Sequence, residues 1–274
     1  MIKLINAGFI YPDKTKIGPI NLNVNKGEVY LLTGKSGSGK TSVTKMINGV
    51  IDNLFDGKRY GELLIDNKNI EEMTIKEVVL NVSSVYQNPK TQFFTDNTTS
   101  ELVFTMENLG YKISDMDIRL NRVSNFFGVE KLLNRNVLEL SGGEKQILCI
   151  ASTLMNDSNI IVLDEPTSNL DLESILKIRQ MILKLKQLNK TILISEHRLN
   201  YLKGLVDKVS FLEDGVITRS FTGQEFYSMT KVERKRLSLR YLDKYEFMGF
   251  INNNSRKTVE KRFYKNTIKI DKLS

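Results

Sequence analysis

The chain has 274 residues, of which 41% are hydrophobic and 26% charged, and it carries a formal net charge of +8. This composition is that of a globular protein and excludes a disordered, collagen-like or disulfide-stapled chain. The single cysteine, Cys149, cannot form an internal disulfide bond, and the single histidine, His197, excludes a multi-histidine metal site. The longest apolar stretches fall short of the roughly 20 residues that a membrane-spanning helix needs. We therefore expect a chain that stays in the cytoplasm, without a signal peptide.

Short β-rich segments alternate with helical ones along the first 225 residues. The expected strands are residues 28–33, 82–86, 160–164, 191–195 and 208–212. Residues 160–163 are apolar on both faces of a strand, as at the centre of a parallel sheet covered by helices. Between residues 97 and 136 the apolar side chains fall at helical spacing, among them Leu102, Phe104, Ile118, Val123, Phe126 and Phe127. The sequence therefore predicts an α/β core with an inserted helical subdomain.

The positive charge is concentrated near the C-terminus. Residues 226–274 hold 13 basic and 5 acidic side chains, whereas residues 1–225 hold 27 of each. A composition shift near residue 223 marks the expected start of a C-terminal segment. A basic segment of this kind suits nucleic acid, an anionic membrane or an acidic partner, and a solvated helical face is the alternative interpretation.

The clearest chemical motif directly follows the expected strand 28–33. Its residues are Gly34, Lys35, Ser36, Gly37, Ser38, Gly39, Lys40 and Thr41, followed by Ser42, and they fit the pattern G-x-x-x-x-G-K-[ST]. The glycines let the backbone fold around an anion so that its amides point at a phosphate group. Lys40 supplies a positive charge to the β- and γ-phosphates, and the Thr41 hydroxyl suits magnesium. The pattern predicts a nucleotide phosphate site.

A second motif lies where the strand 160–164 ends. Asp164 and Glu165 follow four apolar residues, at the edge where an open parallel sheet binds ligands. Asp164 is suited to the magnesium shell, and Glu165 is placed to act as general base on an attacking water. Between the two motifs, Ser141, Gly142 and Gly143 precede an apolar helical run. A serine cap followed by two glycines exposes amide donors at the positive end of a helix.

The order of these motifs carries a family resemblance. Leu140-Ser141-Gly142-Gly143-Glu144-Lys145-Gln146, between a Walker A loop and a Walker B strand, resembles the signature of the ATP-binding-cassette (ABC) family. The resemblance implies an α/β P-loop NTPase cassette over residues 1–222, with a parallel-sheet core and an antiparallel β region. It also implies a helical subdomain at about residues 97–156 that includes the signature, and a C-terminal extension over residues 223–274.

The resemblance assigns further site residues. Tyr11 resembles the aromatic residue that stacks on adenine, and Gln87 the glutamine that approaches magnesium and the attacking water. Ser168-Asn169-Leu170-Asp171 resembles the D-loop, with Asn169 where alanine is more usual. His197 resembles the switch histidine that contacts the γ-phosphate. The implied cofactors are ATP and Mg²⁺, and Gln87 joins Thr41 and Asp164 in the implied metal set.

The resemblance also implies partners. The signature residues of one subunit close on the ATP bound by another, so the working form is a homo- or heterodimer. Gln87-Asn88-Pro89, followed by Gln92-Phe93-Phe94, is similar to the Q-loop of energy-coupling-factor (ECF) ATPases, which power importers of vitamins and transition-metal ions. This surface is then the contact for separate integral membrane subunits, and the chain lies peripherally on the cytoplasmic face of the membrane. The alternative interpretation makes Phe93 and Phe94 ordinary core aromatics.

Two other functions stay open. A soluble ABC ATPase that acts on nucleic acid or ribosomes is the first, motivated by the basic C-terminal segment, although such chains usually carry two cassettes or a long coiled-coil insertion. A nucleotide-dependent phosphotransferase is the second, but it gives no reason for residues 140–146. Because this chain shows neither two cassettes nor a long coiled-coil insertion, the importer is the preferred function and we expect no nucleic-acid partner.

Overall fold

The computed structural model describes residues 1–230, 232, 233 and 237. Two sheets form its framework, and the larger has the strand order β10-β9-β3-β8-β7-β6. Its strands are β3 (Val29–Thr33), β6 (Val82–Val85), β7 (Ile160–Asp164), β8 (Thr191–Ser195), β9 (Lys208–Glu213) and β10 (Val216–Thr222). The strands from β9 to β6 run parallel, and β10 pairs antiparallel with β9. The expected parallel core is confirmed, with each predicted strand within one residue of its observed bounds.

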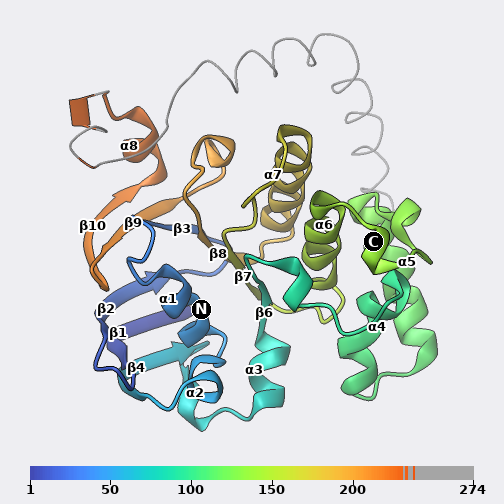
Figure 1. The fold of residues 1–274 in the computed structure, drawn as a ribbon, viewed down its shortest axis with the longest axis horizontal. Coiled ribbons are helices and arrows are strands. Elements are labelled where there is room, and N and C mark those ends of the chain that lie inside the picture. Colours follow the sequence, from blue (N-terminus) through green and yellow to red (C-terminus); the bar gives the residue numbers. More distant parts are fainter. Residues whose placement is uncertain (231, 234–236, 238–274) are drawn as a thin grey trace.

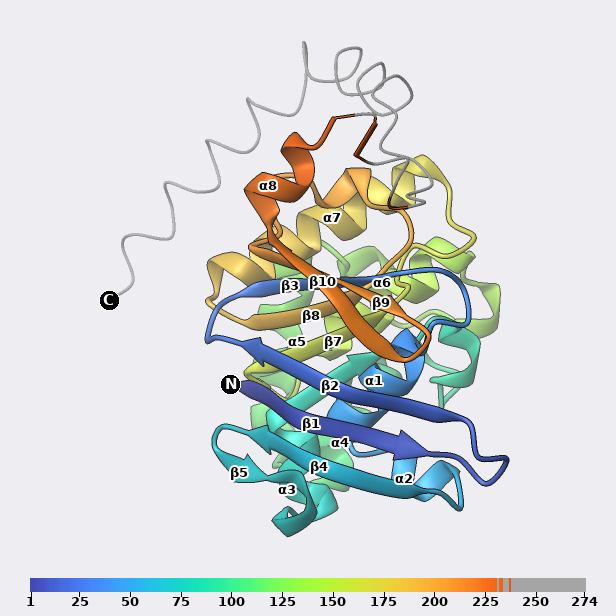
Figure 2. The ribbon, with the colours of Figure 1, turned by 90° about the vertical axis from the view of Figure 1, so that its left-hand side faces the viewer.

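The smaller sheet is antiparallel and has the order β2-β1-β4-β5. Its strands are β1 (Ile2–Ile10), β2 (Lys16–Val24), β4 (Lys58–Ile65) and β5 (Lys68–Asn69). Figure 2 shows these strands along one end of the molecule, with β10 of the larger sheet near β2. The turn from β9 to β10 joins the sheets, because the Gly18 amide donates to the Gly215 carbonyl at 2.7 Å.

Helices cover the larger sheet on both faces (Figure 1). They are α1 (Lys40–Ile47), α2 (Ile51–Leu54), α3 (Ile75–Asn81), α4 (Thr98–Asn108), α5 (Ile113–Phe127), α6 (Gly142–Ser152), α7 (Leu172–Gln187) and α8 (Gly223–Ser228). Single 3₁₀ turns occur at Ile70–Glu72, Pro89–Thr91, Glu130–Leu132, Val137–Glu139 and Asn200–Leu202. None of the helices in the described part has the length and apolar character to span a membrane.

Two hydrophobic cores lie on opposite faces of the larger sheet. Alternate residues of β7 enter different cores: Ile161 and Leu163 pack with α6 and α7, whereas Ile160 and Val162 pack with α1 and the antiparallel sheet. All four are at most 1% exposed. This explains why residues 160–163 are uniformly apolar, since a strand covered on both faces has no solvent side.

The helical region between β6 and β7 is present as expected. The side chain of Asn97 caps α4 by accepting hydrogen bonds from the amides of Thr99 and Ser100. Leu102, Val123 and Phe127 are buried, but Ile118 is 68% exposed. Ile118 is two residues from the buried Met116, and that spacing places it on the opposite side of α5.

The chain continues past β10 into α8, which packs on the larger core. Phe226 is fully buried, with its ring 5.8 Å from that of Phe211, and the Tyr227 hydroxyl donates to the carbonyl of Leu199 at 2.7 Å. Leu237 is partly buried against the same core. The domain boundary at 222/223 stays a prediction. The remaining expected features of the C-terminal segment lie outside the described residues.

Candidate nucleotide and catalytic site

The phosphate loop connects β3 to α1 and needs glycine at two of its turns. Gly34 has φ 156°, and a Cβ there would lie 2.1 Å from the carbonyl oxygen of Leu212. Gly39 caps α1 at φ 101°, where side chains are disfavoured. The Gly215 amide donates to the Ser38 carbonyl at 3.0 Å, so the loop is held by the β9–β10 turn. The fold thus fixes a loop whose backbone amides precede a helix N-terminus.

Lys40 lies inside this loop, and its side chain is only 4% exposed. Its ammonium donates to the carbonyls of Gly34 at 3.3 Å and Lys35 at 3.1 Å, and lies 3.9 Å from Glu165 Oε1. Burial lowers the pKa of Lys40, and nearby carboxylates oppose that effect. The Ser38 hydroxyl is buried and has no hydrogen-bond partner in the described structure. An anion bound in the loop would satisfy both the hydroxyl and the ammonium.

Asp164 is buried at the carboxyl end of β7, with 3% of its surface exposed. It accepts a short hydrogen bond from the Ser195 hydroxyl at the end of the neighbouring strand β8. Burial raises the pKa of Asp164, and hydrogen bonds from Ser195 and Thr41 oppose the rise. A carboxylate beside a threonine hydroxyl is an oxygen donor pair that suits Mg²⁺. No cluster of three metal-binding side chains exists among the residues described, so phosphate and water oxygens would have to complete the shell.

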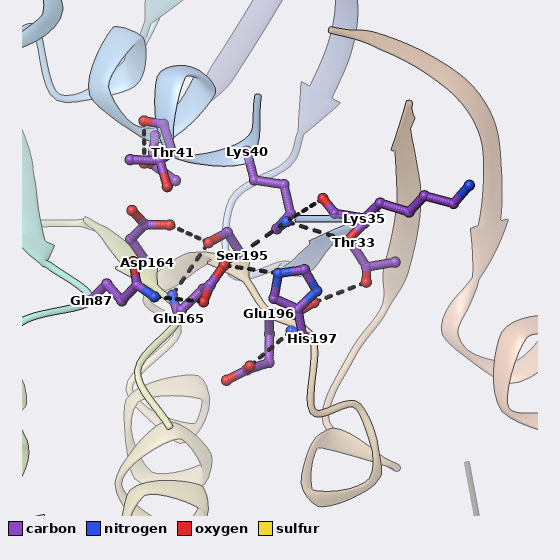
Figure 3. A network of polar contacts seen from close by, with 12 residues as sticks. Thr33, Lys35, Lys40, Thr41, Gln87, Asp164, Glu165, Ser195, Glu196 and His197 are labelled. Carbon is purple, nitrogen blue, oxygen red and sulfur yellow. Dashed lines mark hydrogen bonds and ion pairs between the residues drawn. The ribbon is translucent and has the colours of Figure 1, made fainter. Parts of the chain in front are cut away.

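Glu165 is the centre of the polar network in Figure 3. Its Oε1 lies 3.0 Å from His197 Nε2, and its Oε2 accepts a hydrogen bond from Gln87 Nε2 at 2.9 Å. The hydrogen bond from His197 lowers the pKa of Glu165, so the carboxyl group is ionised at neutral pH. Glu165 also has φ 45°, an uncommon conformation for this residue type that turns its side chain back toward the phosphate loop.

A cavity of about 620 Å³ opens beside this network. Its lining includes the phosphate-loop residues Gly34, Lys35 and Ser36 together with Glu165 and His197. Thr33, Leu199, Phe211, Glu213 and Leu237 complete its lining. Glu165, His197 and part of the phosphate loop therefore face one space large enough for the phosphate portion of a nucleotide, whereas Gln87 is not among the lining residues and reaches the site through Glu165.

Tyr11 is not among the residues that line this cavity. Its hydroxyl is 2.7 Å from the hydroxyl of Ser42, and its ring packs edge-on against Phe9 and Phe55 at centroid distances of 4.9 and 5.0 Å. These contacts orient the ring next to the helix that follows the phosphate loop. Its expected role in base stacking stays a prediction.

The signature residues do not line the cavity. Ser141 caps α6 in a capping box with Glu144, whose carboxylate also pairs with Arg135 at 2.9 Å. Glycine at position 143 lets α6 approach α7 closely, since a Cβ there would lie 2.0 Å from Ser174 Oγ and 2.7 Å from Ser174 Cβ. The side chain of Asp171 caps α7 by accepting from the Ser174 amide. Within the described chain, no hydrogen bond links these residues to the phosphate loop.

Sequence reasoning missed two polar residues at the end of β8. Ser195 bonds to Asp164, and Glu196 accepts hydrogen bonds from the loop that holds His197. Their position offered a signal, since β7 and β8 are adjacent parallel strands whose carboxyl ends meet at one edge. Cys149 is buried in the core, as expected for a small apolar residue, and burial raises the pKa of its thiol.

The sequence profile of the ABC transporter family matches residues 17–168 of this chain. The chain belongs to the ABC transporter family. An ABC transporter ATP-binding protein of Treponema denticola is 40% identical over 242 residues, which cover 88% of this chain and 50% of that protein. A second one from the same organism is 41% identical over 81% of this chain and 45% of its own length. This cassette thus spans about half the length of these curated relatives.

Solved ABC structures share the fold. The cbiO1 protein of Clostridium perfringens, described as part of the ABC transporter complex cbiONQ, is 25% identical with a TM-score of 0.74 over 85% of this chain and 93% of its own. The ABC transporter cassette MJ0796, solved as a dimer, is 26% identical with a TM-score of 0.69 over 81% of this chain and 98% of its own. Another MJ0796 structure holds ADP and phosphate in a post-hydrolysis state. The expected fold class is confirmed.

Proposed function

We propose that this chain is the ATP-binding and ATP-hydrolysing subunit of an ECF-type importer for vitamins or transition-metal ions. The arrangement of Lys40, Gln87 and His197 around the Glu165 carboxylate carries the proposal for hydrolysis. The likeness to cbiO1, which belongs to a transporter complex, supports the choice of this branch. In this proposal the chain is a peripheral subunit on the cytoplasmic face of the membrane.

The residues divide the chemistry among themselves. Lys40 and the loop amides bind the nucleotide phosphates, and Tyr11 stacks on the base. Glu165, ionised at neutral pH, accepts a proton from the attacking water, while the Gln87 amide orients that water. The His197 imidazole stabilises charge on the transferred phosphoryl group. Thr41 and Asp164 would hold magnesium, which neutralises charge on the phosphates, and Gln87 is the further ligand in this proposal.

A second cassette is part of the proposal. Ser141, Gly142 and Gly143 lie outside the cavity of their own chain, so the N-terminus of α6 can close on ATP bound by another cassette. The dimeric structure of MJ0796 and the roughly double length of the curated relatives support such a pairing.

The contact with membrane subunits is proposed at the Q-loop. Phe94 is 74% exposed and its ring stacks on Phe104 of α4 at a centroid distance of 4.8 Å, whereas Phe93 is partly buried against the core. Phe93 thus fits the core interpretation, and Phe94 the contact interpretation. The exposed Phe94 ring lies seven residues from Gln87 and stacks on the half-buried Phe104, so it offers an apolar surface for a partner.

ATP hydrolysis by the full chain tests the first half of the proposal. Lys40→Ala should weaken ATP binding, measured by calorimetry, and abolish most hydrolysis, because the phosphates lose their main side-chain charge. Lys177→Ala, which removes a lysine that is 58% exposed on α7, is the matched control and should bind ATP normally. Unchanged affinity in the Lys40 variant would overturn the assignment of the phosphate site.

Co-purification from membranes tests the second half. A tagged chain should retain integral membrane proteins, and Phe94→Asp should lose them because a charge replaces the apolar contact. Ile113→Asp, at an equally exposed position on α5, is the control that should retain them. If the wild-type chain instead retains nucleic acid in a salt-sensitive manner and no membrane protein, the soluble alternative replaces the importer.

A further inference from the structure

Glu196 is a buried carboxylate beside the only histidine of the chain. It follows β8 directly, precedes His197 and is 2% exposed. Its backbone is fixed to β3, since its amide donates to the Leu32 carbonyl at 3.2 Å and its carbonyl accepts from the Thr33 hydroxyl at 2.9 Å. A carboxylate in such a place is tolerated only when its oxygens are satisfied by hydrogen bonds.

Both oxygens of Glu196 are satisfied, and they reach two different loops. Oε1 accepts from the backbone amides of His197 at 2.8 Å and Arg198 at 3.0 Å. Oε2 accepts from the Thr167 hydroxyl at 2.6 Å and the Tyr201 hydroxyl at 3.1 Å. One carboxylate therefore binds the backbone of the histidine loop with one oxygen and connects that loop to Thr167 with the other.

Thr167 belongs to the loop that carries the expected general base. It lies two residues after Glu165 and is fully buried. A second bond joins the same two loops, because the Arg198 guanidinium donates to the Leu170 carbonyl at 3.0 Å. His197 itself completes the connection through its 3.0 Å contact with Glu165 Oε1 (Figure 3). His197 therefore lies between two residues, Glu196 and Arg198, whose hydrogen bonds fix its loop to the segment 165–170.

We propose that Glu196 is a positioning residue that holds His197 against Glu165, and that it does so by anchoring the histidine loop to Thr167. The proposal rests on the proposed catalytic roles of His197 and Glu165. Because the buried carboxylate binds the two amides that follow it, the direction in which the imidazole leaves the backbone depends on Glu196. Because Thr167 holds the other oxygen, this direction is set relative to Glu165.

The single histidine allows a direct test that does not depend on ATP hydrolysis. Untagged full-length protein with isotope-labelled histidine gives one imidazole signal set in NMR spectra. In Thr167→Val, which removes only the anchoring hydroxyl, the signals should move toward those of Glu165→Ala, where the imidazole has lost its carboxylate neighbour. Thr167→Ser, which keeps the hydroxyl, should restore the wild-type signals. Wild-type imidazole signals in Thr167→Val would overturn the proposal.

Thr153→Val is the matched control for loss of a buried hydroxyl. Thr153 is 2% exposed and its hydroxyl donates to the Ile150 carbonyl at 2.7 Å, away from the histidine loop. This variant should lose some stability yet leave the imidazole signals in place. If Thr167→Val does not fold, Thr167→Ala removes the same hydroxyl without adding bulk and replaces it in the comparison.

Kinetics separate positioning from a general structural effect. Thr167→Val should lower kcat for ATP hydrolysis about tenfold with little change in KM, since a hydrogen bond to a charged group has an effect of this order. In a His197→Ala background the same change should have no further effect, because there is no imidazole left to position. Equal effects in both backgrounds would contradict the proposal. Full activity of His197→Ala alone would instead refute the catalytic role of the histidine, which the NMR comparison does not require.

Discussion

The carboxylate of Glu165 shows how neighbouring residues determine the chemistry of one side chain. Asp164 and Glu165 are adjacent in sequence, yet burial raises the pKa of Asp164, whereas the hydrogen bond from His197 lowers that of Glu165. Asp164 points toward Thr41 and Ser195, and Glu165 toward Lys40 and His197. Environments that separate the pKa values of two adjacent carboxyl groups suit them to different roles.

We expect Glu165→Gln to lower ATP turnover by about 10²- to 10⁴-fold while ATP binding is kept, because the amide cannot accept a proton from water. Turnover is measured as phosphate release and binding by calorimetry. Glu173→Gln, a change at a 71% exposed position on α7, is the control that should behave as wild type. Near-normal phosphate release by the Glu165 variant would remove it as general base.

The pH dependence of the same site has a predicted direction. The His197 hydrogen bond is the largest cause that lowers the pKa of Glu165. In His197→Ala this pKa should therefore rise toward its ordinary value, and the carboxylate should be lost at a higher pH as the solution is acidified. The acid limb of the kcat/KM profile should move to higher pH in this variant. A limb that stays in place would show that Glu165 does not control it.

Sequence predicted the members of the site better than their connections. The motif residues 34–41 and 164–165 are contiguous, so their spacing alone indicates their chemistry. Ser195 and Glu196 act through contacts with residues about 30 positions away, and only the pairing of β7 with β8 brings these together. Family resemblance therefore indicates the role of His197, whereas the hydrogen bonds that hold its loop are visible only in the structure.

At the scale of elements, the buried strands are easier to predict from the sequence than the buried face of a helix. The reason is that a strand covered on both faces is apolar throughout. Residues 160–163 of β7 are uniformly apolar, and this pattern indicates a strand covered on both faces. Helix α5 is amphipathic, and its spacing indicated a helix but did not define which face lies inward. Ile118 is apolar, yet the burial of Met116 and Val123 places it outward. Apolar character alone does not establish burial.

Helix α8 gives an element-scale prediction about stability. Phe226 is fully buried between Phe211 and the rest of the larger core, so Phe226→Ala should lower the free energy of unfolding by about 3–5 kcal/mol. Denaturant unfolding of the full chain measures this. Val232→Ala, a truncation at a 63% exposed position, is the control and should change stability little. A small effect at Phe226 would mean that α8 does not belong to the core of the cassette.

At the scale of the whole molecule, the phosphate loop and the signature belong to different parts of one framework. The phosphate loop lies between the two sheets and is held by the β9–β10 turn. The signature helix α6 belongs to the other core, with α4, α5 and α7. Each part is packed against its own core, so the phosphate loop and the signature of one chain could meet only if that chain refolded. Pairing of two molecules is a simpler way to bring a phosphate loop and a signature together.

The C-terminal segment provides the last prediction. Phe226, Tyr227 and Leu237 pack on the cassette, so a deletion that begins at residue 223 would damage its core. Deletion of residues 238–274 keeps these contacts and removes most of the basic excess of the segment. We expect this variant to bind ATP normally but to show weaker association between subunits without ATP, because the basic side chains attract the partner.

Analytical ultracentrifugation of the two proteins, at low and moderate salt, tests this expectation. If the deletion weakens association, and added salt weakens association of the full chain in the same way, the segment has an electrostatic role, since screening weakens contacts between exposed charges. The same association with and without residues 238–274 would contradict it. Salt-sensitive binding to DNA by the full chain alone would indicate that the segment serves nucleic acid instead, because release of counterions makes such binding steeply dependent on salt.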